Sequence, residues 1–247
     1  MKADPFLQLR LLDLQALDST LDRLAHRRKT LPALAEIQKR DDLVAARQGD
    51  VVLAQTAVSD LQRELDKAEA DIEQVRVRKA RDEERLASGA ITQPKQLEEI
   101  QHEVDTLTKR QSDLEDAELE VMERMEEAQK SLDALLAERS GHDDARAAAV
   151  DERDREWADI DSETTTVKAD RDKMAPEIPA DLLALYEKIR AAQGGIGAGP
   201  IERGRCGGCH VDLLNNEKQA FRDAPVDEVL RHEDCSRILV RTAESGL

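Results

Sequence analysis

The sequence predicts a mainly α protein, in which a long antiparallel coiled-coil helical hairpin is followed by a small C-terminal β domain. Three observations support this fold class. Charged residues make up 37% of the 247 residues and aromatic residues only 2%, a composition typical of long helices with a narrow apolar seam. Apolar residues recur in steps of three and four over most of the chain. All three cysteines lie near the C-terminus, in a segment without this helical pattern.

The first helix is expected over roughly residues 5–28. Asp4 is suited to an N-cap and Pro5 to the first helical position. Leucines then follow at helical spacing: Leu7, Leu11, Leu14, Leu17, Leu21 and Leu24. Pro32 breaks or kinks this helix.

Two longer helices form the predicted hairpin. The second runs from about Pro32 to Ala87, and its clearest heptad positions are Val58, Leu61, Leu65, Ala68, Ile72 and Val75. A turn near 88–94 follows, and Pro94 lies in the first turn of the third helix. That helix carries the longest seam: Leu97, Ile100, Val104, Leu107, Gln111, Leu114, Glu118, Val121, Met125, Ala128, Leu132 and Leu135. The seam returns in a shifted phase at Trp157, Ile160, Thr164, Val167 and Met174, as after a stutter.

The helix lengths constrain the arrangement. Helices of about 55 and about 80 residues span roughly 80 Å and 120 Å. Because the connection at 88–94 is short, they must run antiparallel. The third helix then extends about 25 residues beyond the second, close to the length of the first. We therefore expect the first helix beside the last part of the third.

Pro176 and Pro179 end the long helix. A short amphipathic helix should follow, with Asp181 as its cap, and the glycine-rich stretch 194–200 is either a flexible joint or the start of a strand. Short strands, a helical turn or loop at 215–222 and a closing strand at 238–240 complete the chain. The expected domains are therefore a hairpin at 1–178, a short helix and linker at 179–195, and a zinc ribbon at 196–247.

The ribbon assignment depends on two residue pairs, Cys206-Gly-Gly-Cys209 and His232-Glu-Asp-Cys235. Two residues separate the members of each pair, which is the spacing of a closed tetrahedral zinc site built on two facing turns. Four protein ligands leave no position for water or substrate, so the motif indicates one structural Zn²⁺. His210 is a worse-spaced competitor for His232. A pair of free thiols and a redox pair are the alternatives.

The formal charge of −17 argues against broad electrostatic binding to nucleic acid or anionic lipid. The sequence has no apolar run of the roughly 20 residues that a membrane helix requires, and its N-terminus lacks a signal-peptide core. We therefore expect a cytoplasmic protein that does not bind membranes, in which the thiols serve as metal ligands rather than a disulfide.

Basic side chains around the ribbon are candidates for contact with a partner or nucleic acid. They are Arg203, Arg205, Arg231, Arg237 and Arg241, together with Lys95 at the hairpin turn. Ordinary surface arginines are the simpler interpretation, because the segment from 196 carries seven basic and nine acidic residues. The glycine run near 194 lacks the strand, helix and Gly-Lys-Ser/Thr ending of a phosphate loop. No nucleophilic triad or small-molecule site is apparent.

Four segments together resemble a bacterial family of C4-type zinc-ribbon proteins with an N-terminal coiled-coil hairpin. They are 88–95 (SGAITQPK), 178–190, Cys206-Gly-Gly-Cys209-His210 and 235–240 (CSRILV). The resemblance implies a protein that acts by binding, since some members are linked to an alternative sigma factor, to flagellar regulation or to transcripts. It places the ligands on Cys206, Cys209, His232 and Cys235. His232 is a departure, because the family usually has Cys there.

These features predict a non-enzymatic zinc-binding adaptor that acts through protein–protein contacts, in transcription or RNA-related regulation. The first alternative is a nucleic-acid-binding protein that uses the ribbon arginines. The second is a zinc hydrolase with an open metal site. The expected partner is a protein, with nucleic acid as the alternative.

Overall fold

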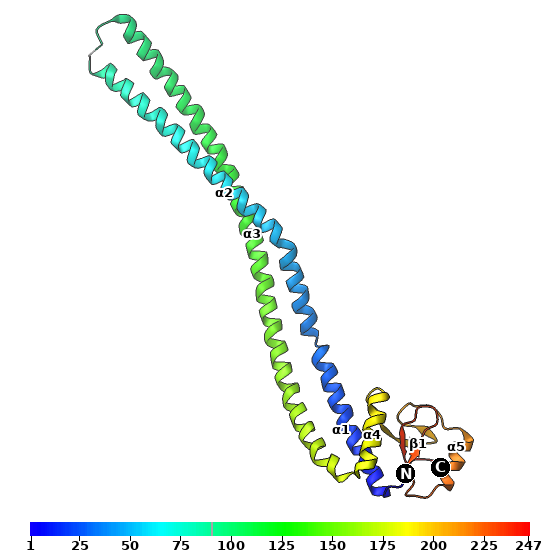
Figure 1. The fold of residues 1–247 in the computed structure, drawn as a ribbon. Coiled ribbons are helices and arrows are strands. Elements are labelled where there is room, and N and C mark those ends of the chain that lie inside the picture. The colour runs from blue at the N-terminus through cyan, green and yellow to red at the C-terminus, as the bar shows by residue number, and fades with distance from the viewer. Residues whose placement is uncertain (90) are drawn as a thin grey trace. The chain divides into compact units, whose positions relative to one another are not determined.

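The computed structural model describes residues 1–89 and 91–247 and contains the expected long helical hairpin (Figure 1). Its helices are α1 (Pro5–Lys29), α2 (Pro32–Ala87), α3 (Pro94–Met174), α4 (Ala180–Ala192) and α5 (Asn215–Asp223), with a 3-10 turn at Ala175–Glu177. Asp4 caps α1 as predicted, because its carboxylate accepts a hydrogen bond of 2.8 Å from the Phe6 N–H. The predicted turn near 88–94 includes Ala90, which lies outside the described residues.

The heptad positions read from the sequence form the seam of the hairpin. All six α2 positions are buried or half-buried, and the same holds for eleven of the twelve on α3, Leu97 being exposed. Gln111 and Glu118 are half-buried within this seam, and Gln111 donates to the Glu115 carboxylate at 2.8 Å. The apolar period of 3.5 residues was therefore sufficient to identify the contacting face.

The contacts divide the chain into two compact units. One comprises 35–149, which includes most of α2 and the first part of α3. The other comprises 1–34 together with 150–247, and so contains both chain ends. This division by contacts cuts across the sequence-based ranges 1–178, 179–195 and 196–247, which remain a prediction.

Helix α1 lies beside the last part of α3, as the lengths predicted. Leu24 and Leu31 form a buried cluster with Ile160. The guanidinium groups of Arg27 and Arg28 pair with Glu156 and Asp161 across the two helices. Helix α4 then covers α1 through a second core that includes Leu11, Leu14, Leu182, Tyr186 and Ile189.

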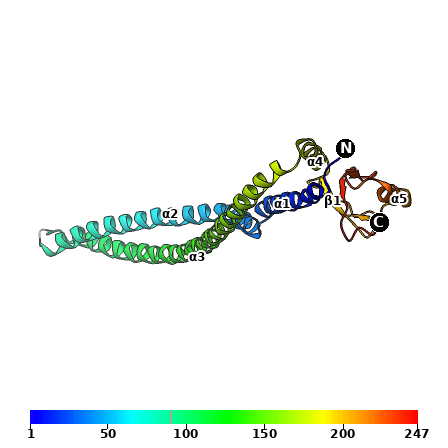
Figure 2. The ribbon, with the colours of Figure 1, turned by 90° about the horizontal axis from the view of Figure 1, so that it is seen from below.

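The C-terminal module contains a four-stranded sheet with the order β2-β1-β4-β3. Figure 2 shows strand β1 and helix α5 of this module near the C-terminus. The strands are β1 (Ala198–Glu202), β2 (Arg205–Cys206), β3 (Leu230–Arg231) and β4 (Ile238–Val240). Strand β4 pairs parallel with β1 and antiparallel with β3. The N-terminus joins this module, since the Ala3 N–H donates to the Asp227 carbonyl at 2.7 Å and the Val229 N–H to the Met1 carbonyl at 3.1 Å.

Three local expectations are refined. The glycine-rich stretch leads directly into β1, and the segment at 215–222 is helix α5 rather than a loop. The predicted cap at Asp181 is wrong, because α4 begins at Ala180 and its N-cap is Pro179, two residues before Asp181. Asp181 instead lies in the first turn, where its carboxylate accepts from the Leu182 N–H at 2.9 Å. The prolyl ring at 179 already restricts the backbone at the helix start.

Within the described residues, every helix is either too short or too polar to cross a lipid bilayer.

Candidate metal centre

The first ligand pair lies on a tight turn that follows β2. The His210 N–H closes the turn by donating to the Cys206 carbonyl at 2.7 Å, and His210 itself adopts a left-handed φ of 62°. Backbone N–H groups of Gly208 and Cys209 donate to the Cys206 sulfur. Such donors favour the thiolate form, although burial of Cys206 outweighs them.

The second pair lies on a turn of the same geometry between β3 and β4. The Ser236 N–H donates to the His232 carbonyl at 2.8 Å, and Ser236 has a left-handed φ of 59°. In both turns the residue after the second ligand reverses the chain. We refer to residues 206–210 and 232–236 as the first and second knuckles.

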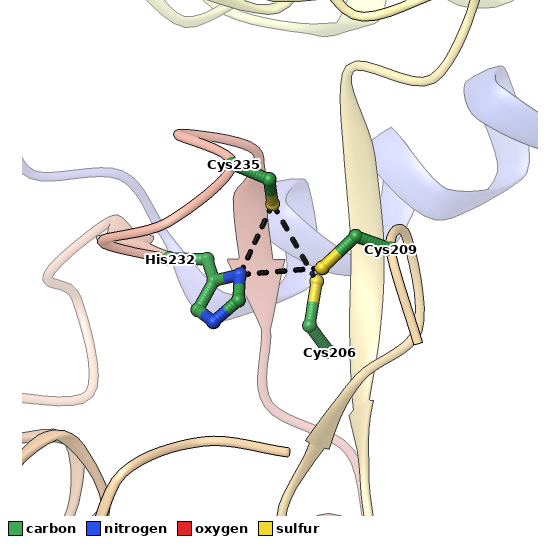
Figure 3. Close-up of side chains that lie close together, drawn as sticks. All are labelled: Cys206, Cys209, His232 and Cys235. Atoms are coloured by element: carbon green, nitrogen blue, oxygen red, sulfur yellow. Dashed lines mark hydrogen bonds between the residues drawn. The ribbon is translucent and has the colours of Figure 1, made fainter. Parts of the chain in front are cut away.

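The two knuckles face one another and bring four ligand atoms together (Figure 3). These atoms, from Cys206, Cys209, His232 and Cys235, all lie within 4.8 Å of one another. The Cys206 and Cys235 sulfurs are 3.9 Å apart, and Nδ1 of His232 lies 3.4 Å from the Cys209 sulfur and 3.1 Å from that of Cys235. Cys206 and His232 are buried. The four residues predicted from spacing can therefore hold a metal ion.

The surroundings shift the pKa values of the Cys206 and Cys209 thiols in opposite directions. Burial raises the pKa of the Cys206 thiol to about 12, although the backbone donors act in the opposite direction. Burial also opposes ionisation of Cys209, but the Val211 N–H, the neighbouring thiols and the Arg237 charge together lower its pKa. Because a metal binds the thiolate form, Cys206 requires a cation beside it to be ionised at neutral pH.

Of the two histidines near the cysteines, only His232 belongs to the cluster. His210, the competitor, is exposed and does not belong to the four-residue cluster. His232 presents Nδ1 to the cluster, while its buried Nε2 has no hydrogen-bond partner in the described chain. The Oδ2 atom of Asp234 lies 3.9 Å from Nε2, which is beyond hydrogen-bond distance.

Gly207 and Gly208 are required by close contacts rather than by backbone conformation. A Cβ at Gly207 would lie 2.7 Å from the Pro200 carbonyl oxygen, and one at Gly208 would lie 2.6 Å from Cδ of Arg237. The first knuckle is therefore pressed against both β1 and the side chain that follows the second knuckle. A side chain at either position would collide with these atoms unless the turn or its neighbour moved.

Most of the candidate arginines are engaged by the backbone. Arg237 donates to the carbonyls of Gln193 and Ile196 at 2.8 and 3.0 Å. Arg241 donates to three carbonyls at the end of α5 and just beyond it, those of Phe221, Ala224 and Pro225.

The remaining candidates lie nearer the surface. Arg205 donates to the His210 carbonyl at 2.8 Å and pairs with Asp212, and Arg231 donates to the Ser236 carbonyl at 3.1 Å. Arg203 and Lys95 are exposed, and neither side chain forms an ion pair within residues 1–89 and 91–247. A contact role for the six basic residues remains a prediction.

A buried polar network in the same unit was not anticipated from the sequence. The Asp18 carboxylate, 1% exposed, accepts from Tyr186 Oη at 2.7 Å and from Arg171 Nε at 2.6 Å. Gln15 accepts from the Gly197 N–H at 2.7 Å and donates to the Gly195 carbonyl at 2.9 Å. The network connects α1, α3 and α4 to the segment that enters β1. Its only sequence signal was the position of two polar residues close to the leucine stripe of α1.

Comparison with known proteins agrees with this architecture. The model of the CT398-like coiled coil hairpin domain matches residues 14–194, which leaves most of the β module beyond the matched range. The protein Rv2229c of Mycobacterium tuberculosis is 38% identical over 241 residues, with 98% of each chain covered. The protein ML1638 of Mycobacterium leprae is 30% identical over 222 residues, covering 90% of this chain and 95% of the relative.

Solved structures show the same fold. A Mycobacterium smegmatis structure has a TM-score of 0.85 at 33% identity and covers 98% of this chain and 100% of its own. CT398 from Chlamydia trachomatis has a TM-score of 0.64 at 21% identity, with 96% and 98% covered. Since the family model spans well over half of the sequence, the chain belongs to the CT398-like coiled-coil hairpin family.

Proposed function

We propose that this protein is a non-enzymatic adaptor whose C-terminal module is held together by one structural Zn²⁺ and which acts through protein–protein contacts. The observation that carries this proposal is the closed group of three sulfurs and one imidazole nitrogen on two matched knuckles. A catalytic zinc usually has three protein ligands and an open position. In the proposed site, the fourth residue of the cluster would fill that position.

The ligand spacing supports zinc. Zn–S bonds of about 2.3 Å and Zn–N bonds of about 2.0 Å place tetrahedral ligand atoms about 3.5 to 3.8 Å apart. Three of the six separations in this site are 3.9, 3.4 and 3.1 Å, and all six lie within 4.8 Å. A thiolate-rich donor set also favours zinc over magnesium or calcium, which prefer oxygen. Bound zinc would stabilise the knuckles and would offset two of the three thiolate charges.

X-ray absorption spectroscopy on protein purified without chelator tests the proposal. We expect one zinc per chain, with three sulfur neighbours and one nitrogen neighbour from imidazole. A water oxygen in place of the imidazole would overturn the closed site and support the hydrolase alternative. Substoichiometric zinc would contradict the proposal altogether.

The adaptor role is tested by affinity capture on the full chain, with and without nuclease. A protein retained by the zinc-loaded chain after nuclease treatment, and lost after chelation, is the expected result. Loss of all retained material on nuclease treatment would instead favour the nucleic-acid alternative. The engagement of Arg237 and Arg241 by backbone carbonyls counts against that alternative, because those guanidinium groups have fewer donors left for phosphates.

A further inference from the structure

A groove of about 160 Å³ lies between α4 and the second knuckle. Helix α4 contributes Leu185, Lys188, Ile189 and Ala192 to its lining, and the residue after the helix, Gln193, adds to them. The knuckle side contributes Arg231 and Ser236. The last three α4 residues lie three, four and seven positions after Leu185, so all four share one helix face. All of these residues belong to the same compact unit.

The charge of this groove is opposite to that of the chain. Its lining contains two cations and no acidic residue, in a protein with 54 Asp and Glu residues and a net charge of −17. Four other surface cavities of the described chain each include at least one carboxylate, for example Asp22 or Glu156. Lys188 and Arg231 form no ion pair with any of residues 1–89 and 91–247.

Several hydrogen-bond donors around the groove have no acceptor within residues 1–89 and 91–247. Arg231 uses Nε to hold the Ser236 carbonyl at 3.1 Å, which leaves its two terminal nitrogens available. Across the described residues, the ammonium of Lys188 and the hydroxyl of Ser236 take part in no hydrogen bond. Ile189 is 5% exposed and Leu185 half-buried, so apolar surface lies between these polar groups.

We propose that this groove docks a short segment of a partner protein in which an Asp or Glu residue adjoins an aliphatic one. The carboxylate binds between Lys188 and Arg231, and the aliphatic side chain packs against Leu185 and Ile189. Charge-assisted hydrogen bonds to a guanidinium favour a carboxylate over a neutral group. The inference rests on the proposed adaptor function and specifies its docking surface and the chemistry of its partner.

A peptide fits the groove better than a nucleic acid does. Single-stranded nucleic acid is bound by an extended row of cations and by aromatic platforms. The groove has two cations, an apolar floor and no aromatic side chain in its lining. An acidic and aliphatic segment matches both features at once.

Metal binding should control the groove, because one of its walls belongs to the second knuckle. Arg231 precedes the ligand His232, and Ser236 follows the ligand Cys235. Releasing the metal removes the constraint that fixes these two residues against α4. Peptide binding should therefore require the loaded metal site.

Selection from a random peptide display library on the zinc-loaded full chain tests the proposal. The expected consensus contains Asp or Glu next to Leu, Ile or Val. A labelled synthetic consensus peptide should bind at least about tenfold more weakly to Lys188→Glu and to Arg231→Glu, since each reversal replaces an attraction by a repulsion. Arg222→Glu on α5 is the matched control, with the same charge change in the same module, and should bind as the wild type does.

Several outcomes would overturn the inference: no enriched sequence, a basic consensus, or binding that survives both reversals. Equal displacement of the peptide by inorganic phosphate or by an RNA oligonucleotide would also do so, as it would indicate a general anion site. Elemental analysis and circular dichroism on each variant separate this failure from failure of the adaptor proposal. If the reversed variants keep zinc and still retain the captured protein partner, the groove is wrong and the adaptor function stands.

Discussion

Each candidate ligand is held by its own local backbone as well as by the cluster. His210 and Ser236, the residues after Cys209 and Cys235, adopt left-handed conformations that close the two knuckles. A non-glycine residue in this region carries strain, which four metal bonds can offset. The site is thus specified at the level of single residues.

Ligand substitutions test that specification. Cys206→Ser and His232→Ala should each release the metal and unfold the C-terminal module, because a structural zinc contributes about 10–16 kcal/mol in small modules. His232→Cys should retain the metal with four sulfurs, and His210→Ala should behave as the wild type. Elemental analysis and hydrogen exchange at Ile238 to Val240 provide the measurements. Retained zinc in His232→Ala would contradict the assignment of the fourth ligand.

Asp18 is the second residue with a large expected effect. Its carboxylate is shared between Arg171, Arg190 and Tyr186. Asp18→Asn removes the buried charge that the two guanidinium groups share and leaves them only their more exposed partners, Glu187 and Asp22, so it should lower the free energy of unfolding by about 3 kcal/mol. Asp22→Asn, at a half-exposed carboxylate, should cost well under half of that. Urea unfolding followed by Trp157 fluorescence compares the two, and equal effects would contradict a special role for Asp18.

Tyr186 gives a pH dependence with a defined sign. Burial, followed by the hydrogen bond to Asp18, raises the pKa of its hydroxyl above the ordinary value of 10.0. The folded state therefore keeps a proton that the unfolded state loses, so this stabilisation is complete below pH 10 and is lost as the pH rises above it. Since the chain has a single Tyr, near-ultraviolet absorbance reports tyrosinate directly. Tyr186→Phe should show a shallower alkaline loss of stability, and an identical slope would contradict the prediction.

At the scale of elements, the junction between α1 and α2 depends on a side chain from α3. Trp157 donates from Nε1 to the Arg28 carbonyl at 3.1 Å, near the end of α1. The guanidinium groups of Arg28 and Arg153 lie 4.8 and 4.7 Å from its ring centre. The indole thus satisfies a helix-terminal carbonyl and stacks with two cations.

Removing only the indole donor should weaken this junction. Trp157→Phe keeps an aromatic face but loses the hydrogen bond, and should lower stability by about 1 kcal/mol. Trp157→Ala should cost more, because packing against the Leu24 and Leu31 cluster is also lost. Thermal unfolding by circular dichroism measures both changes. A Trp157→Phe protein as stable as the wild type would show that the bond to Arg28 is dispensable.

At the scale of the whole molecule, the two compact units should respond differently to metal removal. The hairpin unit at 35–149 is held by its apolar seam and contains none of the four ligands. The β module has only a small apolar cluster, so we expect it to depend on the proposed zinc. Chelation should therefore leave most of the far-ultraviolet helical signal while hydrogen exchange accelerates in 198–240. Loss of most helicity on chelation would contradict this independence.

The sequence by itself predicted the ranges of the three long helices, the heptad seam and the four residues that the structure brings together. These features depend on residues close together in the sequence. A helix face repeats every three or four residues, and a knuckle needs two ligands separated by two residues. Only the tertiary structure decided the roles of Gln15, Asp18 and Tyr186, the parallel pairing of β1 with β4, and the pairing of the N-terminus beside Val229. Each of these features depends on contacts between segments that are far apart in the chain. From the sequence, a polar residue on a helix is expected to be exposed to solvent, whereas the packing of α4 against α1 buries Gln15 and Asp18.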